Sequence, residues 1–297
     1  MEAAAAGAMN SVILYGHRVL REAVSGPGAD GSDALTPAGL ERLLAAIATH
    51  RPDAGWLARL ASGQPAQPGC VLLTFDDGYA DIYTEALPLL EQYRVPCVIF
   101  ITTGFADREL EAYETLLATL LAGRRELVCP NEGPLALADD SARSAVYRRL
   151  RLWLRPQGRR GRQRYMDALR QLNPAAPAAA DGGYLDWARI RELDRHPLVT
   201  VGAHGRSHIL LSRPHPLEVY GELRHSRSRL ERELGRRVDL VAYPYGANTA
   251  LTRLLARRAG YRLGFGTQPG TLAGNRNRMA LPRMPIAGYL DGLQEPA

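Results

Sequence analysis

The chain has 297 residues, 46% of them apolar, so it can bury a large core as one α/β barrel or as two small domains, and we favour one barrel with an insertion. The net charge of +6 would suit an anionic partner, but the 31 acidic residues are an ordinary number and no nucleic-acid-binding motif is present, so nucleic acid is not expected as a partner. The three cysteines, Cys70, Cys97 and Cys129, lack metal-ligand and CxxC spacing, which argues against a disulfide framework or a catalytic thiol.

The start of the chain does not resemble a secretory signal. Residues 1–19 have no Lys or Arg before their apolar segment and no long apolar run. No apolar run in the chain approaches the roughly 20 residues that a membrane-spanning helix needs. We therefore expect a cytoplasmic protein without a transmembrane segment, in which residues 1–10 form a disordered tail.

The first predicted elements are a strand and a helix. The apolar segment 11–15 predicts a short strand, and His17 follows it closely. Pro37 and apolar spacings of three and four predict an amphipathic helix over 35–50. Residues 51–70 are expected to be rich in loops.

A buried strand at 71–75, a helix at 83–94 and a second buried strand at 97–102 follow in the sequence. This βαβ step is typical of an α/β barrel with parallel strands. Further strands are expected at 198–201, 239–243, 260–267 and 281–286, with helices at 187–194 and 217–234.

Between the second and third of the buried strands, residues 104–183 have a different pattern. Helical segments predominate and no strand of note is expected, so we interpret this stretch as a helical insertion. Its basic residues would form either a solvated helical face or a docking site for a phosphate-bearing carrier or an anionic membrane surface. These residues are Arg143, Arg148, Arg149, Arg151, Arg155, Arg159, Arg160, Arg162 and Arg164.

Two adjacent carboxylates, Asp76 and Asp77, follow the strand at 71–75, and Gly78 allows the chain to turn there. The carboxyl ends of parallel strands are where ligands and catalytic groups gather in α/β folds. Two carboxylates this close repel each other unless a cation lies between them. The pair therefore indicates a metal site.

A His-x-x-x-His pair, His204 and His208, follows another predicted strand and offers two more ligands. Positions four apart share one face of a helical turn, so both imidazoles can reach one metal. One carboxylate and two histidines, with open positions for water, describe a catalytic site for zinc or another divalent metal.

Three motifs occur in a fixed order: TFDDG at 74–78, HxxxH at 204–208 and AYPYG at 242–246. In this order they resemble the first three motifs of the polysaccharide deacetylases, the NodB-homology or carbohydrate esterase 4 group. The resemblance covers most of the chain, from about residue 11 to 286. It implies an α/β fold, a distorted or incomplete (β/α)7 TIM-like barrel, as a single domain over 11–290 with the helical insertion at about 104–183.

The last motif of this family, a strand that ends in a general-acid histidine, is usually near the C-terminus. Here no histidine follows His225. A circularly permuted branch, resembling the poly-N-acetylglucosamine deacetylases, carries this motif at the N-terminus as Tyr-His, and Tyr15-Gly16-His17 is similar with one glycine inserted. The resemblance thus implies that His17 is the general acid; a structural strand-end histidine is the alternative.

The third motif of the family usually begins with an arginine that orients the catalytic aspartate, and its tyrosine donates a backbone N–H to the oxyanion. Ala242 stands at the position of this arginine. Arg283, in the late strand, is the candidate replacement, with a structural ion pair as the alternative. Tyr245 would supply the oxyanion N–H, unless it is only a turn residue.

The resemblance and the chemistry of the site together imply metal-assisted hydrolysis of an N-acetyl sugar. Asp77, His204 and His208 would hold a divalent metal, with Zn²⁺ as the first expectation and Ni²⁺, Co²⁺ or Fe²⁺ as alternatives; the metal would polarise the acetyl carbonyl and activate water. Asp76 would act as general base, and His17 would protonate the leaving amine.

Two other functions remain open at this point. The missing arginine and the displaced histidine would also suit a catalytically inactive saccharide-binding homologue, and the same metal site could act on another N-acyl substrate, such as a formyl group or a cyclic imide. The three intact ligands favour deacetylation of an amino-sugar-containing saccharide: an exopolysaccharide, its precursor or a glycoconjugate, including phosphate- or lipid-linked forms. The oligomeric state is left open.

Overall fold

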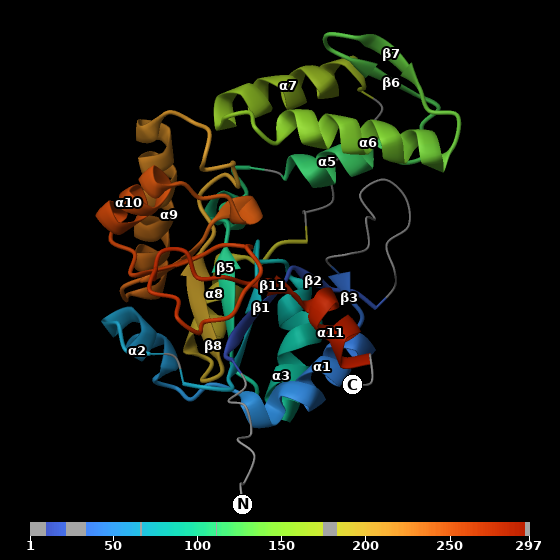
Figure 1. The fold of residues 1–297 in the computed structure, drawn as a ribbon. Coiled ribbons are helices and arrows are strands. Elements are labelled where there is room, and N and C mark those ends of the chain that lie inside the picture. The colour runs from blue at the N-terminus through green and yellow to red at the C-terminus, as the bar shows by residue number, and fades with distance from the viewer. Residues whose placement is uncertain (1–9, 22–33, 66, 111, 175–182, 295–297) are drawn as a thin grey trace, which may run out of the picture.

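The computed structural model describes residues 10–21, 34–65, 67–110, 112–174 and 183–294. Seven parallel strands form one curled sheet in the order β10-β9-β8-β5-β4-β1-β11 (Figure 1). The expected α/β fold, a distorted (β/α)7 barrel, is confirmed. The strands are β1 (Val12–Gly16), β4 (Val71–Phe75), β5 (Cys97–Ile101), β8 (Val199–Ala203), β9 (Leu240–Ala242), β10 (Leu263–Phe265) and β11 (Met284–Pro285).

Alternate residues of the central strands face two different apolar cores. In β4, the odd-numbered residues from Val71 to Phe75 pack in the core between the sheet and its helices, whereas Leu72 packs in a second core. This second core contains Phe100 of β5 and Phe265 of β10, whose ring centroids lie 5.0 Å apart although two strands separate β5 from β10 in the sheet. The second core therefore lies on the concave side of the curled sheet. Because side chains alternate along a strand, the residues after Leu72 at even positions also point into the curl.

The segment that precedes β11 links the two edges of the sheet. Leu281 N donates to Gly264 O at 2.8 Å, and Gly266 N donates to Leu281 O at 2.9 Å, so this segment runs beside β10. A few residues later, Met284 pairs with Leu14 of β1. The late segment therefore contacts both the last and the first long strands of the curl.

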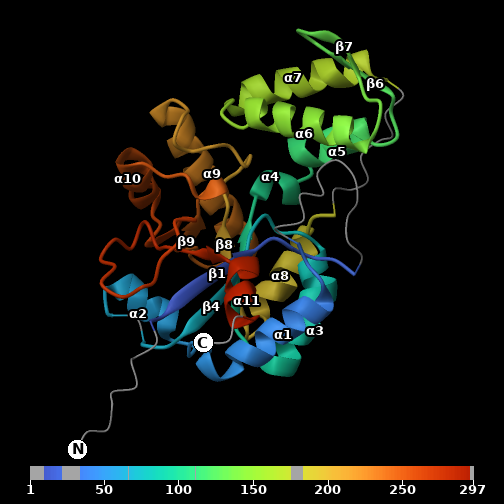
Figure 2. The same cartoon turned by 45° about the vertical axis from the view of Figure 1, so that its right-hand side comes forward.

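Helices surround the outer face of the sheet, with α1, α3 and α8 on one flank and α9 and α10 on the other (Figure 2). The short helix α2 closes the inner core through Trp56 and Leu60. The helices outside the insertion are α1 (Pro37–Ile47), α2 (Trp56–Ser62), α3 (Leu87–Tyr93), α4 (Thr103–Ala106), α8 (Trp187–Arg195), α9 (Pro216–Leu234), α10 (Ala250–Ala259) and α11 (Ile286–Gln294). Shorter elements are β2 (Arg18–Val19), β3 (Ala34–Leu35), η1 (Ala48–His50), the π-helical η2 (Ile82–Ala86) and η3 (Pro244–Gly246). Among the described helices, none is long and apolar enough to cross a bilayer.

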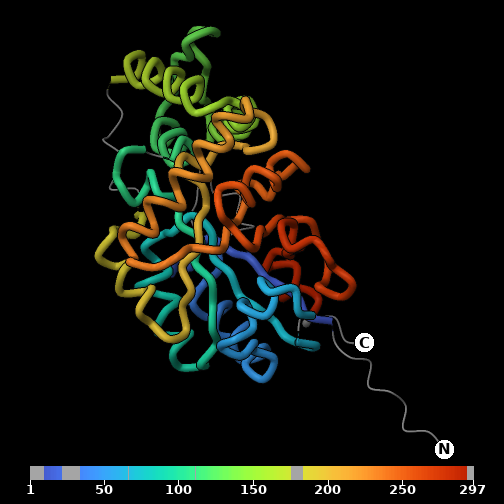
Figure 3. The backbone as a smooth tube through the Cα atoms, turned by 90° about the vertical axis from the view of Figure 1, so that its left-hand side faces the viewer, coloured from blue at the N-terminus to red at the C-terminus, as the bar shows by residue number. Residues whose placement is uncertain are grey.

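Residues 113–172, between β5 and β8, form a mainly helical layer above the carboxyl ends of the strands (Figure 3). This layer has its own apolar core, which includes Leu117, Leu150 and Leu169. The proposed limits of the single domain, 11–290, and of the insertion, 104–183, stay predictions. The elements of this layer are α5 (Tyr113–Leu121), β6 (Glu126–Cys129), β7 (Gly133–Ala136), α6 (Asp140–Leu154) and α7 (Arg159–Leu172).

One expectation about local structure is wrong, and another is incomplete. The insertion contains a β-hairpin, β6–β7, because Leu127 and Cys129 alternate into its core and Gly133 takes the positive φ of the turn. The stretch 51–70 contains α2, which Gly63 ends in a left-handed conformation. The predicted disordered tail falls almost wholly on residues 1–9, which lie outside the described residues.

Candidate active site

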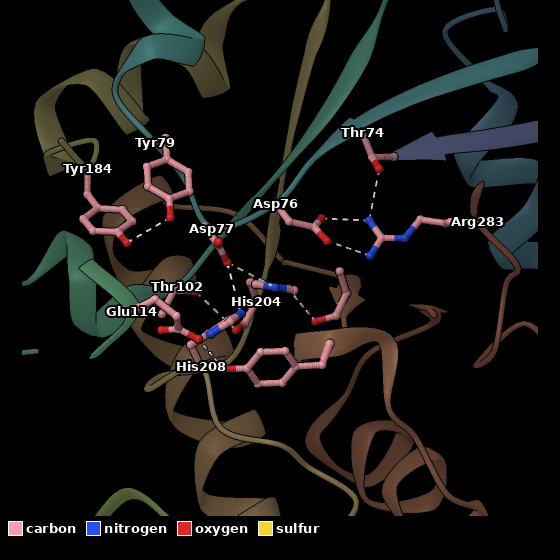
Figure 4. A network of polar contacts seen from close by, with 12 residues as sticks. Thr74, Asp76, Asp77, Tyr79, Thr102, Glu114, Tyr184, His204, His208 and Arg283 are labelled. Atoms are coloured by element: carbon pink, nitrogen blue, oxygen red, sulfur yellow. Dashed lines mark hydrogen bonds and ion pairs between the residues drawn. The ribbon is translucent and has the colours of Figure 1, made fainter. Parts of the chain in front are cut away.

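Asp76 stands at the carboxyl end of β4 and forms a two-point ion pair with Arg283 inside the barrel (Figure 4). Nη1 and Nη2 of Arg283 each donate to one carboxylate oxygen at 2.7 Å, while Nη1 also donates to Thr74 Oγ1 at 3.0 Å and Nε donates to Gly266 O at 2.8 Å. Arg283 is fully buried and Asp76 is 3% exposed. Burial raises the pKa of Asp76, but the positive charge of Arg283 and its hydrogen bonds to the carboxylate outweigh burial, and the pKa falls below its ordinary value. Asp76 is therefore ionised at neutral pH.

Asp77, His204 and His208 converge on one point beside this pair. His204 Nε2 and His208 Nε2 lie 3.4 and 3.3 Å from the same oxygen, Asp77 Oδ1. One donor atom from each residue lies within 4.8 Å of the others, and all three side chains are buried. Burial lowers the pKa of His204 to about 4 and that of His208 well below its ordinary value. Both imidazoles are neutral at pH 7 and can offer a lone pair to a cation.

A second layer of contacts orients the two histidines. His204 Nδ1 lies 2.9 Å from Ala242 O; because a carbonyl can only accept, Nδ1 carries the proton and Nε2 is left to face Asp77. The loop between the histidines is held by Glu222 of α9, which is 4% exposed and accepts from Arg206 N at 3.1 Å and Ser207 N at 2.8 Å. Ala242, the position at which the family's arginine is missing, thus contributes through its backbone.

Backbone strain is concentrated at these residues. Of the five non-glycine residues with positive φ in the described ranges, three are Asp77 (72°), His208 (49°) and Tyr245 (59°). The left-handed region costs an L-residue roughly 1–2 kcal/mol, so such residues occur where the surroundings impose the geometry. The turn that Gly78 was expected to permit begins at Asp77 itself.

His17 lies at the same edge, after β1. Asp76 N donates to Gly16 O at 2.9 Å, which places the end of β1 beside the Asp76 turn. The charge of His17 is one of the influences that lower the pKa values of Asp76, His204 and His208. The structure thus brings His17 to the group predicted from sequence, whereas its role as an acid stays a prediction.

Tyr245 joins this group to the helical layer above it. Its ring centroid lies 4.6 Å from that of His208, and its hydroxyl donates to Glu114 Oε1 at 2.8 Å and lies 3.2 Å from Tyr113 OH. The guanidinium of Arg155 packs over the ring of Tyr245, with Cζ 4.4 Å from the ring centroid. Helix α5 and the end of α6 therefore form one wall of the site.

The turn that carries Tyr245 depends on Gly246. Gly246 has φ +67°, and a Cβ there would lie 2.6 Å from Thr267 N, so Gly246→Ala is expected to cost about 2–5 kcal/mol of unfolding free energy through backbone strain and overpacking. Gly274→Ala is the matched control, because Gly274 has φ +69° with no atom within 4 Å of the added Cβ. Urea denaturation measures both variants, and equal losses would show that the contact with Thr267 is of no consequence.

A family model described as polysaccharide deacetylase matches residues 63–264, more than half of the chain. The chain belongs to the polysaccharide deacetylase family. The matched range includes the Asp76-Asp77 pair, both histidines and Tyr245, whereas His17 and Arg283 lie outside it. YxkH of Bacillus subtilis strain 168, whose name places it provisionally among the polysaccharide deacetylases, is 19% identical over 223 residues, which are 75% of this chain and 53% of YxkH. The chain thus spans about half the length of this curated relative.

Solved deacetylase structures share the fold of this family member. Streptococcus pyogenes PplD, determined in complex with acetate, superposes with a TM-score of 0.59 at 18% identity, covering 97% of this chain and 100% of PplD. The deacetylase domain of BpsB from Bordetella bronchiseptica gives 0.58 at 18% identity, with 93% and 96% covered. IcaB from Ammonifex degensii gives 0.56 at 19% identity, with 95% and 97% covered.

Several residues that line or support the site are not marked as such by the sequence. Thr74 belongs to the TFDDG motif, and its position two residues before Asp76 on the same strand indicates that it faces the same side as Asp76. The others come from helices whose sequence shows only amphipathic periodicity, so nothing local marks them. They are Tyr113, Glu114, Arg162 and Glu222.

Proposed function

We propose that the protein is a metal-dependent hydrolase that removes N-acetyl groups from an amino-sugar-containing saccharide. The observation that carries this proposal is the convergence of Asp77, His204 and His208 beside the ionised Asp76, in a chain of the polysaccharide deacetylase family. One carboxylate oxygen and two neutral imidazole nitrogens form a donor set that fits Zn²⁺, with Ni²⁺, Co²⁺ or Fe²⁺ as alternatives. When bound, the metal would polarise the acyl carbonyl and make water more acidic.

The side chains around this donor set account for the proton transfers. Asp76, which Arg283 holds in its ionised form, would accept the proton of the attacking water. The backbone N–H of Tyr245 would donate a hydrogen bond to the developing oxyanion. His17 would give a proton to the leaving amine, as in the circularly permuted branch of the family that the N-terminal Tyr-Gly-His segment resembles.

The proposed substrate is an exopolysaccharide, its precursor or a glycoconjugate, and the proposed location is the cytoplasm. Incubation of the zinc-loaded protein with N-acetylglucosamine oligomers tests the reaction, with acetate release as the readout. Acetate above the level of the apo protein is expected. Release of formate from N-formyl sugars, or ring opening of a cyclic imide, without acetate would replace deacetylation with another deacylation, and binding of oligomers without any turnover would indicate a saccharide-binding homologue.

Asp77→Ala is expected to abolish stoichiometric metal binding, because it removes the oxygen to which both histidines point. Isothermal titration with Zn²⁺ measures the binding. Asp81→Ala is the matched control: this carboxylate is at the same edge with a side chain 10% exposed, as in Asp77, but it pairs with Arg18 at 2.9 Å. Metal at full stoichiometry in Asp77→Ala would refute the ligand assignment.

A further inference from the structure

The net positive charge of the protein is concentrated in the α6–α7 hairpin. Residues 140–172 include ten arginines and two aspartates, a net charge of +8, while the whole chain carries +6. The rest of the chain is thus slightly acidic. The hairpin stands above the carboxyl edge of the sheet, where the candidate active site lies (Figures 1 and 2).

The outer face of this hairpin presents charges that the protein does not neutralise. Arg148 of α6 and Arg160 and Arg164 of α7 are exposed, and within the part of the chain that the structure describes none of them forms an ion pair. By contrast, Arg149 pairs with Glu132 at 2.7 Å. Three exposed, unpaired guanidinium groups on this hairpin would attract anions.

Large apolar side chains are exposed beside these arginines. At the end of α6, Leu152 is 66% exposed and Trp153 is 45% exposed. The Trp153 ring rests against the ring of Tyr165, with centroids 4.6 Å apart, so its exposed edge is held in place. An amphipathic indole fixed at a surface between arginines is typical of contact with the headgroup region of a bilayer.

The first turn of α9 lies beside the α6–α7 turn and exposes another leucine. Arg159 N donates to Glu218 Oε1 at 3.1 Å, which joins the α6–α7 turn to the start of α9. Leu217, the neighbour of Glu218, is 75% exposed. We call Leu152, Trp153 and Leu217 the apolar tip.

The inner face of the same hairpin contacts the candidate site. Arg162 Nη1 donates to His208 O at 2.9 Å, and the Arg155 guanidinium covers the ring of Tyr245. A partner bound to the outer face would therefore lie next to the site rather than on the far side of the barrel.

We propose that the outer face of α6–α7, together with the apolar tip, docks on an anionic phospholipid membrane. Free arginines supply long-range attraction to anionic headgroups, and the apolar tip can insert among them, as in proteins that bind a bilayer without spanning it. The positive charge of the hairpin is complementary to the negative charge of the lipid headgroups, which favours an anionic membrane as the partner. The proposal concerns binding alone, so it stands or falls independently of the deacetylase activity.

Cosedimentation with lipid vesicles tests the electrostatic part. The full chain is expected to bind vesicles of phosphatidylcholine mixed with phosphatidylglycerol, to bind phosphatidylcholine alone much more weakly, and to be released by salt. The triple variant Arg148→Gln, Arg160→Gln, Arg164→Gln should bind roughly 100-fold more weakly. The matched control is Arg42→Gln, Arg257→Gln, Arg258→Gln, which removes the same charge from exposed positions on α1 and α10. An equal loss in this control, or no preference for the anionic vesicles, would overturn the proposal.

Tryptophan fluorescence tests the apolar part. Of the three tryptophans, Trp56 is 1% exposed and Trp187 is half-buried on α8, where its Nε1 donates to Asp107 Oδ1 at 2.8 Å. A blue shift on addition of anionic vesicles is therefore assigned to Trp153 only if it is lost when Trp153 is replaced. The double variant Leu152→Ser, Trp153→Ser should lose the shift and bind at least tenfold more weakly. The matched control is Leu251→Ser, Leu254→Ser, which removes two leucines that are 47% and 43% exposed on α10. Thermal unfolding of every variant checks that it is folded, and unchanged binding by a folded Leu152→Ser, Trp153→Ser variant would refute insertion of the tip.

Discussion

Asp76→Asn is expected to lower the kcat of acetate release by about 10²- to 10⁴-fold while the protein still binds one equivalent of metal. Asparagine has nearly the size of aspartate, and its oxygen can accept a hydrogen bond from Arg283, but it cannot take up a proton at neutral pH. Because Asp76 is not among the three converging donors, the metal site should persist. Steady-state kinetics and metal analysis of the same preparation measure both quantities.

The outcomes of this substitution separate two roles of the residue. Turnover at the wild-type rate would refute the assignment of Asp76 as general base. Loss of metal would instead indicate that Asp76 is a metal ligand in addition to Asp77. Since the variant leaves the guanidinium of Arg283 buried without a full counter-charge, its unfolding free energy must be measured so that kcat refers to folded protein.

Arg283→Ala is expected to reduce the unfolding free energy by about 3–5 kcal/mol at pH 7, because it leaves the Asp76 carboxylate buried without its partner. The loss should depend on pH. In the wild type the pKa of Asp76 is depressed, so its contribution to stability is present above the ordinary pKa and lost as the pH falls. In the variant, which lacks the charge of Arg283, burial of the Asp76 carboxyl raises its pKa above the ordinary value. The unfolding free energy of the variant therefore falls as the pH rises through this pKa. The difference between the two proteins should therefore be larger at pH 7 than at pH 4, which urea denaturation at both pH values measures.

The double variant Asp76→Asn, Arg283→Met provides the control for this ion pair. It removes both charges and keeps much of the buried volume, so it should recover a large part of the stability that Arg283→Ala loses. It should not recover turnover, because no base is present. A double variant as unstable as Arg283→Ala would show that packing of the arginine side chain, rather than the unpaired carboxylate, determines the loss.

The strands of the sheet can be predicted from the sequence, since they are short apolar runs bounded by turn residues. Val71–Phe75 was predicted with its observed bounds, and Cys97–Ile101 differs from the prediction by one residue. The Asp76-Asp77 pair and the two histidines were found because they stand at strand ends within motifs. The family resemblance drawn from these motifs is confirmed by the match to residues 63–264.

Contacts between elements that lie far apart in the chain could not be predicted from the sequence. Glu114 accepts a hydrogen bond from Tyr245, which lies 131 residues later in the chain. The regular amphipathic pattern of α5 gives no indication of this contact. The hairpin β6–β7 is two strands of four residues each, too short for alternation to stand out from helical segments on both sides. Arg283 was proposed as the partner of Asp76 only because the family's usual arginine was missing.

The ion pair between Asp76 and Arg283 joins residues 207 positions apart. Arg283 lies on the late segment that pairs with both β10 and β1. During translation, the strand that precedes Asp76 leaves the ribosome long before Arg283 is synthesised. The first strands can pair with each other at that stage, but the inner core cannot close around a lone carboxylate without a large desolvation cost. We therefore expect the nascent chain to form its helices early and the geometry of the Asp76 site last, so that the proposed activity would appear only after Arg283 has been synthesised.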